Sequence, residues 1–268
     1  MYIIEQLANL LRSKGTSEPP LIFENTQLEQ VLGPRLIRKL APDDEMYAGD
    51  LKQYWSVAFS ALRFINLALL AADKTAPRSI LDFPCGHGRV LRVLHAAFPQ
   101  ASLTAVDLNR SAVKYCAKTF GAQAVYAHQS PEQILLTGKF DLIFCGSLLT
   151  HLAAERWNGF LKLFCSHLEP GGVLIFTTHG DVSVDWLMTG KQTYGLKPAQ
   201  IELILQAHQA TGFGYQDYTA QSAYGISISS LPWVLAEAAK LPELQLVTCL
   251  PQAWSNHQDV YAYVRATE

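Results

Sequence analysis

Apolar positions follow two different rhythms along this chain. Up to about residue 76 they recur at helical spacing, with Val57, Ala61 and Phe64 on one face of a helix expected over residues 53–71. Beyond that point, short apolar runs alternate with amphipathic stretches. Such alternation predicts parallel strands joined by right-handed helical crossovers, and therefore an α/β fold.

The alternating region gives a specific series of elements. Strands are expected over residues 79–83, 102–106, 122–127, 140–145 and 173–178, and helices over 89–98, 111–120 and 153–168. The alternation stops after residue 180, where one helix (198–210) and a stretch rich in Gly and Tyr are expected. A helix capped by Ser229 or Ser230 and two strands, 244–250 and 259–265, follow as a hairpin at the sheet edge.

Four segments follow from this pattern. Residues 1–76 are expected to form an N-terminal helical cap, 77–180 a Rossmann-like core, 181–228 a substrate-facing lid insertion, and 229–268 the completion of the core. The first residues are expected to form a short amphipathic helix and no signal peptide.

Composition narrows the choice of partners. The 268 residues carry 21 Lys and Arg against 23 Asp and Glu, so the chain lacks the basic field of proteins that bind nucleic acid or anionic lipid. Five cysteines without a C-x-x-C pair disfavour a disulfide framework and a structural metal, and they favour the cytoplasm. Because no apolar run approaches membrane length, no membrane span is expected. The oligomeric state is left open.

A glycine-rich segment, I-L-D-F-P-C-G-H-G-R, occupies residues 80–89. A strand that leads through two glycines into a helix lets a ligand approach the backbone, although a plain turn can need two glycines as well. Asp107 ends the next strand, 19 positions after Gly88, where a carboxylate can accept from both ribose hydroxyls. Alternatively, Asp107 or Asn109 caps the following helix.

The charge of Asp82 separates two kinds of nucleotide. A carboxylate just before the loop repels a pyrophosphate and suits a ligand with an ammonium and a sulfonium group, such as S-adenosyl-L-methionine. The third glycine of a dinucleotide fingerprint is also replaced, by Leu91. Both observations oppose an NAD(P)-dependent reductase, which is kept as the alternative together with a non-catalytic S-adenosylmethionine-binding protein.

Residues 79–180 resemble the core of the class I S-adenosylmethionine-dependent methyltransferases. The family's D-x-G-x-G-x-G motif stands as D-F-P-C-G-H-G, with Pro84 for the first glycine, and its later motifs as F-D-L-I-F-C-G-S-L-L-T-H-L and L-E-P-G-G-V-L-I-F-T-T. The resemblance implies a seven-stranded, mostly parallel sheet of order 3-2-1-4-5-7-6 with helices on both faces. It implies cofactor contacts in the glycine loop (Asp82, Pro84, Cys85, Gly86, Gly88), after the second strand (Asp107, Leu108), after the third (Gln129, Ser130) and after the fourth (Cys145, Gly146, Ser147).

The sequence says less about the acceptor of the methyl group than about the cofactor. The N-P-P-Y signature of amine acceptors is absent, and a hydroxyl acceptor needs a base, for which His151 and His179 are the candidates. Either histidine can instead be structural. Residues 171–268 carry four basic and eight acidic residues and many aromatics, which favours an uncharged small molecule such as a sugar or glycan hydroxyl. Those aromatics can also simply pack the lid.

Overall fold

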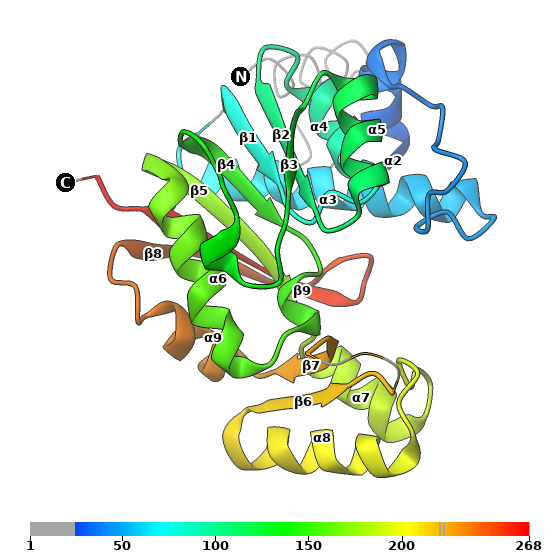
Figure 1. Ribbon diagram of the computed structural model, residues 1–268, viewed down its shortest axis with the longest axis vertical. Helices are drawn as coiled ribbons and strands as arrows, with labels where there is room; N and C mark the ends of the chain where they lie inside the picture. The colour runs from blue at the N-terminus through cyan, green and yellow to red at the C-terminus, as the bar shows by residue number, and fades with distance from the viewer. Residues whose placement is uncertain (1–24, 75, 220, 222, 268) are drawn as a thin grey trace, which may run out of the picture.

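The computed structural model describes residues 25–74, 76–219, 221 and 223–267. The amphipathic helix expected at the start of the chain lies outside these residues. A seven-stranded sheet forms the centre of the molecule, in the order β3-β2-β1-β4-β5-β9-β8 (Figure 1). Its strands are β1 Ser79–Asp82, β2 Ser102–Asp107, β3 Gln123–Tyr126, β4 Phe140–Cys145, β5 Leu168–Thr178, β8 Leu244–Trp254 and β9 Gln258–Arg265.

Strand pairing confirms the predicted fold class. Strands β1 to β5 pair in parallel, and β9 is antiparallel to both β5 and β8. When only the strands of this sheet are counted, the order is 3-2-1-4-5-7-6. Successive residues of a strand point to opposite faces of the sheet. Ile80, for example, packs against the helices on one face and Leu81 against those on the other.

Helices cover both faces of the sheet. One core contains side chains of α2 (Asn25–Leu32), α3 (Leu51–Ala71), α4 (Leu91–Ala97) and α5 (Arg110–Phe120). The opposite core contains side chains of α6 (Ala154–His167) and α9 (Leu231–Ala238). Three short 3-10 turns complete the sheet with its flanking helices, which is called the body below: η1 (Gly33–Arg35), η2 (Pro131–Gln133) and η3 (Leu149–His151).

Helix ends agree with simple capping chemistry. Asp50 accepts from the Gln53 amide and starts α3 two residues before the expected position. Ser230 accepts from the Trp233 amide, which identifies it, and not Ser229, as the cap of α9. Helix α3 is long and apolar enough to cross a membrane, but 61% of its apolar window is buried in the structure. The mostly buried window is that of a core helix, as the packing of α3 on β8 shows.

Between β5 and α9 the chain leaves the sheet and builds a separate layer, here called the insertion. It consists of α7 (Asp181–Thr189), α8 (Pro198–Thr211), β6 (Phe213–Asp217) and β7 (Gly225–Ser229), seen at the bottom of Figure 1. The sequence analysis predicted only α8 here and missed α7 and the β6–β7 hairpin. Gly214 explains why the hairpin lacks an ordinary strand pattern, since a Cβ there would collide with the Ile204 carbonyl oxygen of α8.

Candidate active site

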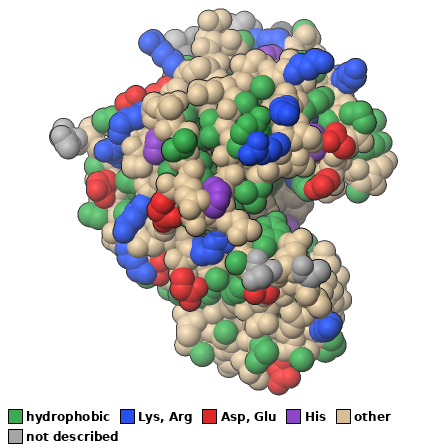
Figure 2. All heavy atoms as spheres, viewed as in Figure 1, with side chains coloured by type: hydrophobic (Ala, Val, Ile, Leu, Met, Phe, Trp, Pro, Cys, Tyr) green, Lys and Arg blue, Asp and Glu red, His purple; other side chains and the backbone are tan. Residues whose placement is uncertain are grey.

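A cavity of about 650 Å³ opens at the carboxyl ends of β1, β2 and β4. Parallel α/β sheets bind their ligands at this edge. Figure 2 shows the surface hollowed between the body and the insertion. The predicted positions that line the cavity are Asp82, Pro84, Cys85, Gly86, Asp107, Leu108, Gln129, Gly146, Ser147 and His151. Gly88, Ser130, Cys145 and His179, which were also predicted, do not line it.

The deepest charge in the cavity is the carboxylate of Asp82. Its side chain is 1% exposed, and neither oxygen has a hydrogen-bond partner among the described residues. Burial, and then the negative charge of Asp107, raise its pKa well above the usual value, while the nearby Leu91 amide lowers it. A buried carboxylate without a partner is costly unless a ligand supplies a cation or a donor. Asp82 is therefore suited to the ammonium group of a ligand.

The glycine loop after β1 is held from two sides. Gly86 and Gly88 have φ values of +49° and +82°, which other residues rarely adopt. The Cys85 and Cys116 thiols both donate to the Gly86 carbonyl, at 3.2 and 3.4 Å. The neighbouring Cys116 thiol, followed by burial, raises the pKa of Cys85, so this thiol remains protonated. Cys85 is thus a buried residue that stabilises the loop through its hydrogen bond to Gly86.

Asp107 accepts two backbone hydrogen bonds at the end of β2. Its Oδ2 accepts from the Gly86 amide and its Oδ1 from the Asn109 amide, both at 2.8 Å. Asn109 itself caps α5, so the helix-cap alternative belongs to Asn109 and not to Asp107. Each carboxylate oxygen keeps a second lone pair for a ligand hydroxyl. Leu108, 58% exposed, lines the cavity beside it and offers an apolar surface to a flat ring.

The loops after β3 and β4 close two other sides of the cavity. Gln129 lines it, and Arg156 of α6 donates to the Gln129 carbonyl at 2.5 Å. After β4, a Cβ on Gly146 would lie 2.6 Å from the Phe144 ring and 2.8 Å from the Trp254 ring. Ser147 follows with φ of +61°, and its amide donates to Thr177 Oγ1 at 2.8 Å. The turn Gly146–Ser147 after β4 therefore has no room for a side chain at position 146.

His151 lies in η3 at the cavity wall. Its Nδ1 donates to the Gly225 carbonyl at 2.8 Å, and its ring stacks on Tyr224. This bond assigns the neutral tautomer in which Nε2 is the acceptor. No described residue is hydrogen-bonded to Nε2. Burial lowers the pKa of the ring, against the opposing effect of the Gly225 carbonyl. His151 is thus a neutral base next to the cavity.

His179 occupies a different environment. It is 3% exposed, its Nδ1 donates to the Ser227 carbonyl at 3.2 Å, and its ring stacks on His257 at 4.9 Å. Burial, followed by the charges of His257 and His151, lowers its pKa well below the usual value. The structure therefore places His179 in the joint between β5 and the insertion, away from the cavity. Of the two candidate bases, only His151 reaches the site.

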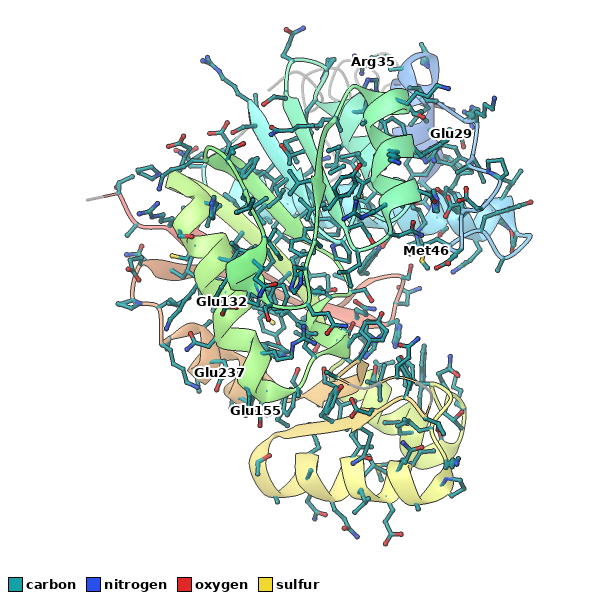
Figure 3. All side chains as sticks on the ribbon, in the orientation of Figure 1. Glu29, Arg35, Met46, Glu132, Glu155 and Glu237 are labelled. Atoms are coloured by element: carbon teal, nitrogen blue, oxygen red, sulfur yellow. The ribbon has the colours of Figure 1, made fainter. Side chains whose placement is uncertain are left out.

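Several lining residues were missed by the sequence analysis. The loop before α3 contributes Asp44, Glu45 and Met46 to the cavity lining (Figure 3 labels Met46). Arg89, Arg156 and Asn109 also line the cavity. Apart from Arg89, which ends the glycine-rich segment of residues 80–89, these positions belong to no motif. Only the fold brings them to the site.

The aromatic residues of the lid divide into two groups. Six aromatic residues lie between β5 and α9 (Trp186, Tyr194, Phe213, Tyr215, Tyr218 and Tyr224), and of these only Tyr224 lines the cavity. Trp186 and Tyr194 stack on His257, and Phe213 stacks on Trp233. Trp254, the last residue of β8, also lines the cavity. Most lid aromatics therefore pack the insertion against the body.

Comparisons with known proteins agree with this geometry. Residues 80–172 match the family model of a methyltransferase domain. The chain is similar to a malonyl-[acyl-carrier protein] O-methyltransferase of Anoxybacillus flavithermus, with 29% identity over 147 residues, 52% of this chain and 56% of that protein. It therefore spans about half the length of the curated relatives it matches.

Two solved structures share the fold. An S-adenosylmethionine-dependent methyltransferase from Clostridium acetobutylicum superposes with a TM-score of 0.53 and 16% identity, over 84% of this chain and 96% of that one. The N-methyltransferase NodS of Bradyrhizobium japonicum, in complex with S-adenosyl-L-homocysteine, gives a TM-score of 0.50 and 15% identity, over 89% and 98%. At these identities the likeness concerns the fold.

Proposed function

We propose that this chain, whose residues 80–172 match the family model of a methyltransferase domain, transfers a methyl group from S-adenosylmethionine to an oxygen atom of a small molecule. The observation that carries this proposal is the buried, unpartnered carboxylate of Asp82 beside Asp107 in one cavity. Together they suit a nucleoside with a positively charged amino acid. The carboxylate of Asp82, directly before the glycine loop, opposes the pyrophosphate of NAD(P).

Each cavity residue then has a role. Asp82 binds the ammonium group, Asp107 accepts from the ribose hydroxyls, and Leu108 packs against the adenine. When bound, S-adenosylmethionine supplies an already activated methyl group. The protein mainly aligns the acceptor behind that group and excludes water. Gly146 and Ser147, at the end of β4, border the region where the two molecules meet.

His151 favours a hydroxyl over other oxygen acceptors. A carboxylate is already ionised at neutral pH and needs no base, whereas an alcohol must lose its proton during the transfer. His151 is neutral, and its Nε2 is the open acceptor of a ring that borders the cavity. Relatives named malonyl-[acyl-carrier protein] O-methyltransferases make a carboxyl acceptor the second candidate. Among the aromatic residues discussed above, only Tyr224 and Trp254 line the cavity and so support a sugar hydroxyl as the acceptor.

Calorimetry tests the cofactor. S-adenosylhomocysteine should bind to the wild-type protein and NADH should not. Asp107→Ala should weaken that binding about 100-fold or more, because it removes charged hydrogen bonds worth about 1.5–3 kcal/mol each. The exposed Asp185→Ala on α7 is the matched control. Binding of NADH instead, or full affinity in Asp107→Ala, contradicts the proposal.

The acceptor is tested with labelled cofactor. Candidate hydroxyl and carboxyl compounds are incubated with the protein and methyl-labelled S-adenosylmethionine, and the products are treated with alkali. Methyl ethers survive this treatment and methyl esters do not. Alkali-stable label supports a hydroxyl acceptor. Alkali-labile label identifies a carboxyl acceptor, and binding without transfer to any compound identifies a cofactor-binding protein without activity.

A further inference from the structure

A second unpaired charge lies in the same cavity as Asp82. Arg89 follows the glycine loop and lines the cavity, with its guanidinium carbon 6.0 Å from the centroid of the Tyr54 ring. Within the described part of the chain, Arg89 makes no hydrogen bond, and no carboxylate lies within 4.0 Å of its guanidinium. Burial lowers its pKa against the opposing influence of Tyr54 and Asp44. Arg89 is therefore a desolvated cation without a counterion.

Arg92, one turn later, shows what a structural arginine looks like here. Its guanidinium is fully buried and donates to the carbonyls of Ile37 at 2.7 Å, Lys39 at 3.3 Å and His87 at 3.4 Å. Arg92 thereby ties the loop before α3 to the glycine loop. Arg89 has no comparable bonds, so its position is not explained by a structural role of this kind.

The nearest negative charges do not neutralise Arg89. Asp44 is already engaged, because its two oxygens accept from the Tyr54 hydroxyl at 2.8 Å and from the Met46 amide at 3.0 Å. Asp82 faces the same cavity, but its oxygens lie beyond 4.0 Å from the guanidinium. One unpaired carboxylate and one unpaired guanidinium thus flank a single glycine turn. This arrangement complements the ammonium and carboxylate groups of an α-amino acid.

We propose that Arg89 binds the carboxylate of the cofactor's amino-acid end while Asp82 binds its ammonium group. This inference rests on the proposed function, since it assigns a residue to S-adenosylmethionine. It makes the site selective for nucleosides that carry a complete amino acid. A ligand without the carboxylate would leave the Arg89 guanidinium unpaired in the cavity.

Binding of three related nucleosides tests the assignment without measuring activity. S-adenosylhomocysteine carries both groups, decarboxylated S-adenosylmethionine carries only the ammonium, and 5′-methylthioadenosine carries neither. Arg89→Gln should weaken S-adenosylhomocysteine about 10- to 100-fold and leave the other two within about twofold of the wild type. Arg89→Lys keeps the charge and should recover part of the loss. Arg38→Gln, which removes an exposed ion pair with Glu29 outside the cavity, is the matched control.

The outcomes separate the two proposals. Unchanged binding of S-adenosylhomocysteine by Arg89→Gln overturns the role of Arg89 and leaves the proposed function intact. An equal loss for all three nucleosides also overturns it, because the variant then damages the pocket as a whole. Failure of the wild-type protein to bind any of the three overturns the proposed function, and this inference with it. Retained 5′-methylthioadenosine binding shows that the variant is folded.

Discussion

His151 and Tyr224 stack with their ring centroids 4.8 Å apart and their planes inclined by 23°. The contact joins η3 of the body to the loop that precedes β7 of the insertion, and the Gly225 carbonyl fixes the ring from the side. The His151 side chain, at the cavity wall, therefore belongs to the body but is held in place by residues of the insertion. The orientation of the candidate base depends on both.

Replacing His151 should reduce turnover and spare cofactor binding. His151→Phe retains the stacking on Tyr224 but removes the base, so kcat for a hydroxyl acceptor should fall about 10²- to 10⁴-fold while the Kd for S-adenosylhomocysteine stays unchanged. His167→Gln, at the end of α6 and outside the cavity, is the control. Full activity of His151→Phe would exclude a base at this position.

The pH profile of the wild-type enzyme provides a second check on His151. A base must be deprotonated to act, and burial lowers the pKa of His151 below its usual 6.5. The rate should therefore be constant through neutral pH and decline only below about pH 6.5. The decline should be absent from the residual activity of His151→Phe. A rate that still rises between pH 7 and 9 would point to a different group.

Asp82→Asn should stabilise the free protein and weaken cofactor binding. The pKa of Asp82 is raised in the folded state, so between its unfolded and folded pKa values the native protein binds more protons than the unfolded chain, and stability falls as pH rises. Asparagine removes this loss at neutral pH. Thermal unfolding should show a higher Tm, about 2–4 °C for each kcal/mol regained, and calorimetry a weaker S-adenosylhomocysteine complex. A lower Tm with unchanged affinity would show that Asp82 is structural.

The cofactor half of the site was predictable because it is local. A glycine turn between a strand and a helix, and an acidic residue at the next strand end, occupy fixed sequence spacings. The sequence therefore predicts Asp82, Gly86 and Asp107, and the structure places all three at the cavity. The same spacing could not decide whether Asp107 or Asn109 caps α5. Both side chains lie within reach of that helix start, and only their observed hydrogen bonds distinguish them.

The acceptor half depends on contacts between distant segments. The strand-end rule placed both His151 and His179 at the open edge of the sheet, but β7 packs over His179 and buries it. Met46 reaches the cavity from the loop before α3, where no motif marks it, and Arg89 ends the glycine-rich segment, which assigned it no role. Strand β6 was missed in part because Gly214, in close contact with α8, interrupts its apolar pattern. Sequence rules indicate which edge is used, and packing decides which side chains reach it.

Acidification should loosen the joint between the body and the insertion. His257 Nε2 is hydrogen-bonded to the Tyr194 hydroxyl at 2.6 Å, the His257 ring stacks on His179, and burial lowers the pKa of His257 to about 4. The pKa of Tyr194 is raised by burial to about 12, so the phenol keeps its proton and donates. Since the folded pKa of His257 lies below the unfolded 6.5, the unfolded chain binds more protons between these values, and stability falls as pH decreases from about 6.5 towards 4.

Urea unfolding at pH 7, 6 and 5 measures this effect. The free energy of unfolding should decrease over the series, and the decrease should be smaller in His257→Gln, whose amide can still hydrogen-bond to Tyr194 but does not titrate. Buried His179 contributes in the same direction, so some slope should remain. Three parallel curves for the wild type and the variant would show that His257 does not sense pH in the joint.

Gly88→Ala should damage the cofactor site although Gly88 does not line the cavity. Its φ of +82° disfavours alanine, and the new Cβ would lie 2.6 Å from Phe120 Cε2 and 3.1 Å from Cys116 Sγ. Gly190, at the end of α7, has a similar φ of +70°, but a Cβ added there would meet no atom within 4 Å. Gly190→Ala should therefore cost about 1–2 kcal/mol from backbone strain alone, and Gly88→Ala about 1–3 kcal/mol more from overpacking.

Because Gly88 holds the turn that presents Gly86 to Asp107, only Gly88→Ala should also weaken S-adenosylhomocysteine binding. Urea unfolding and calorimetry of the pair check this, and equal losses of stability in both variants would mean that the loop relaxes around the methyl group.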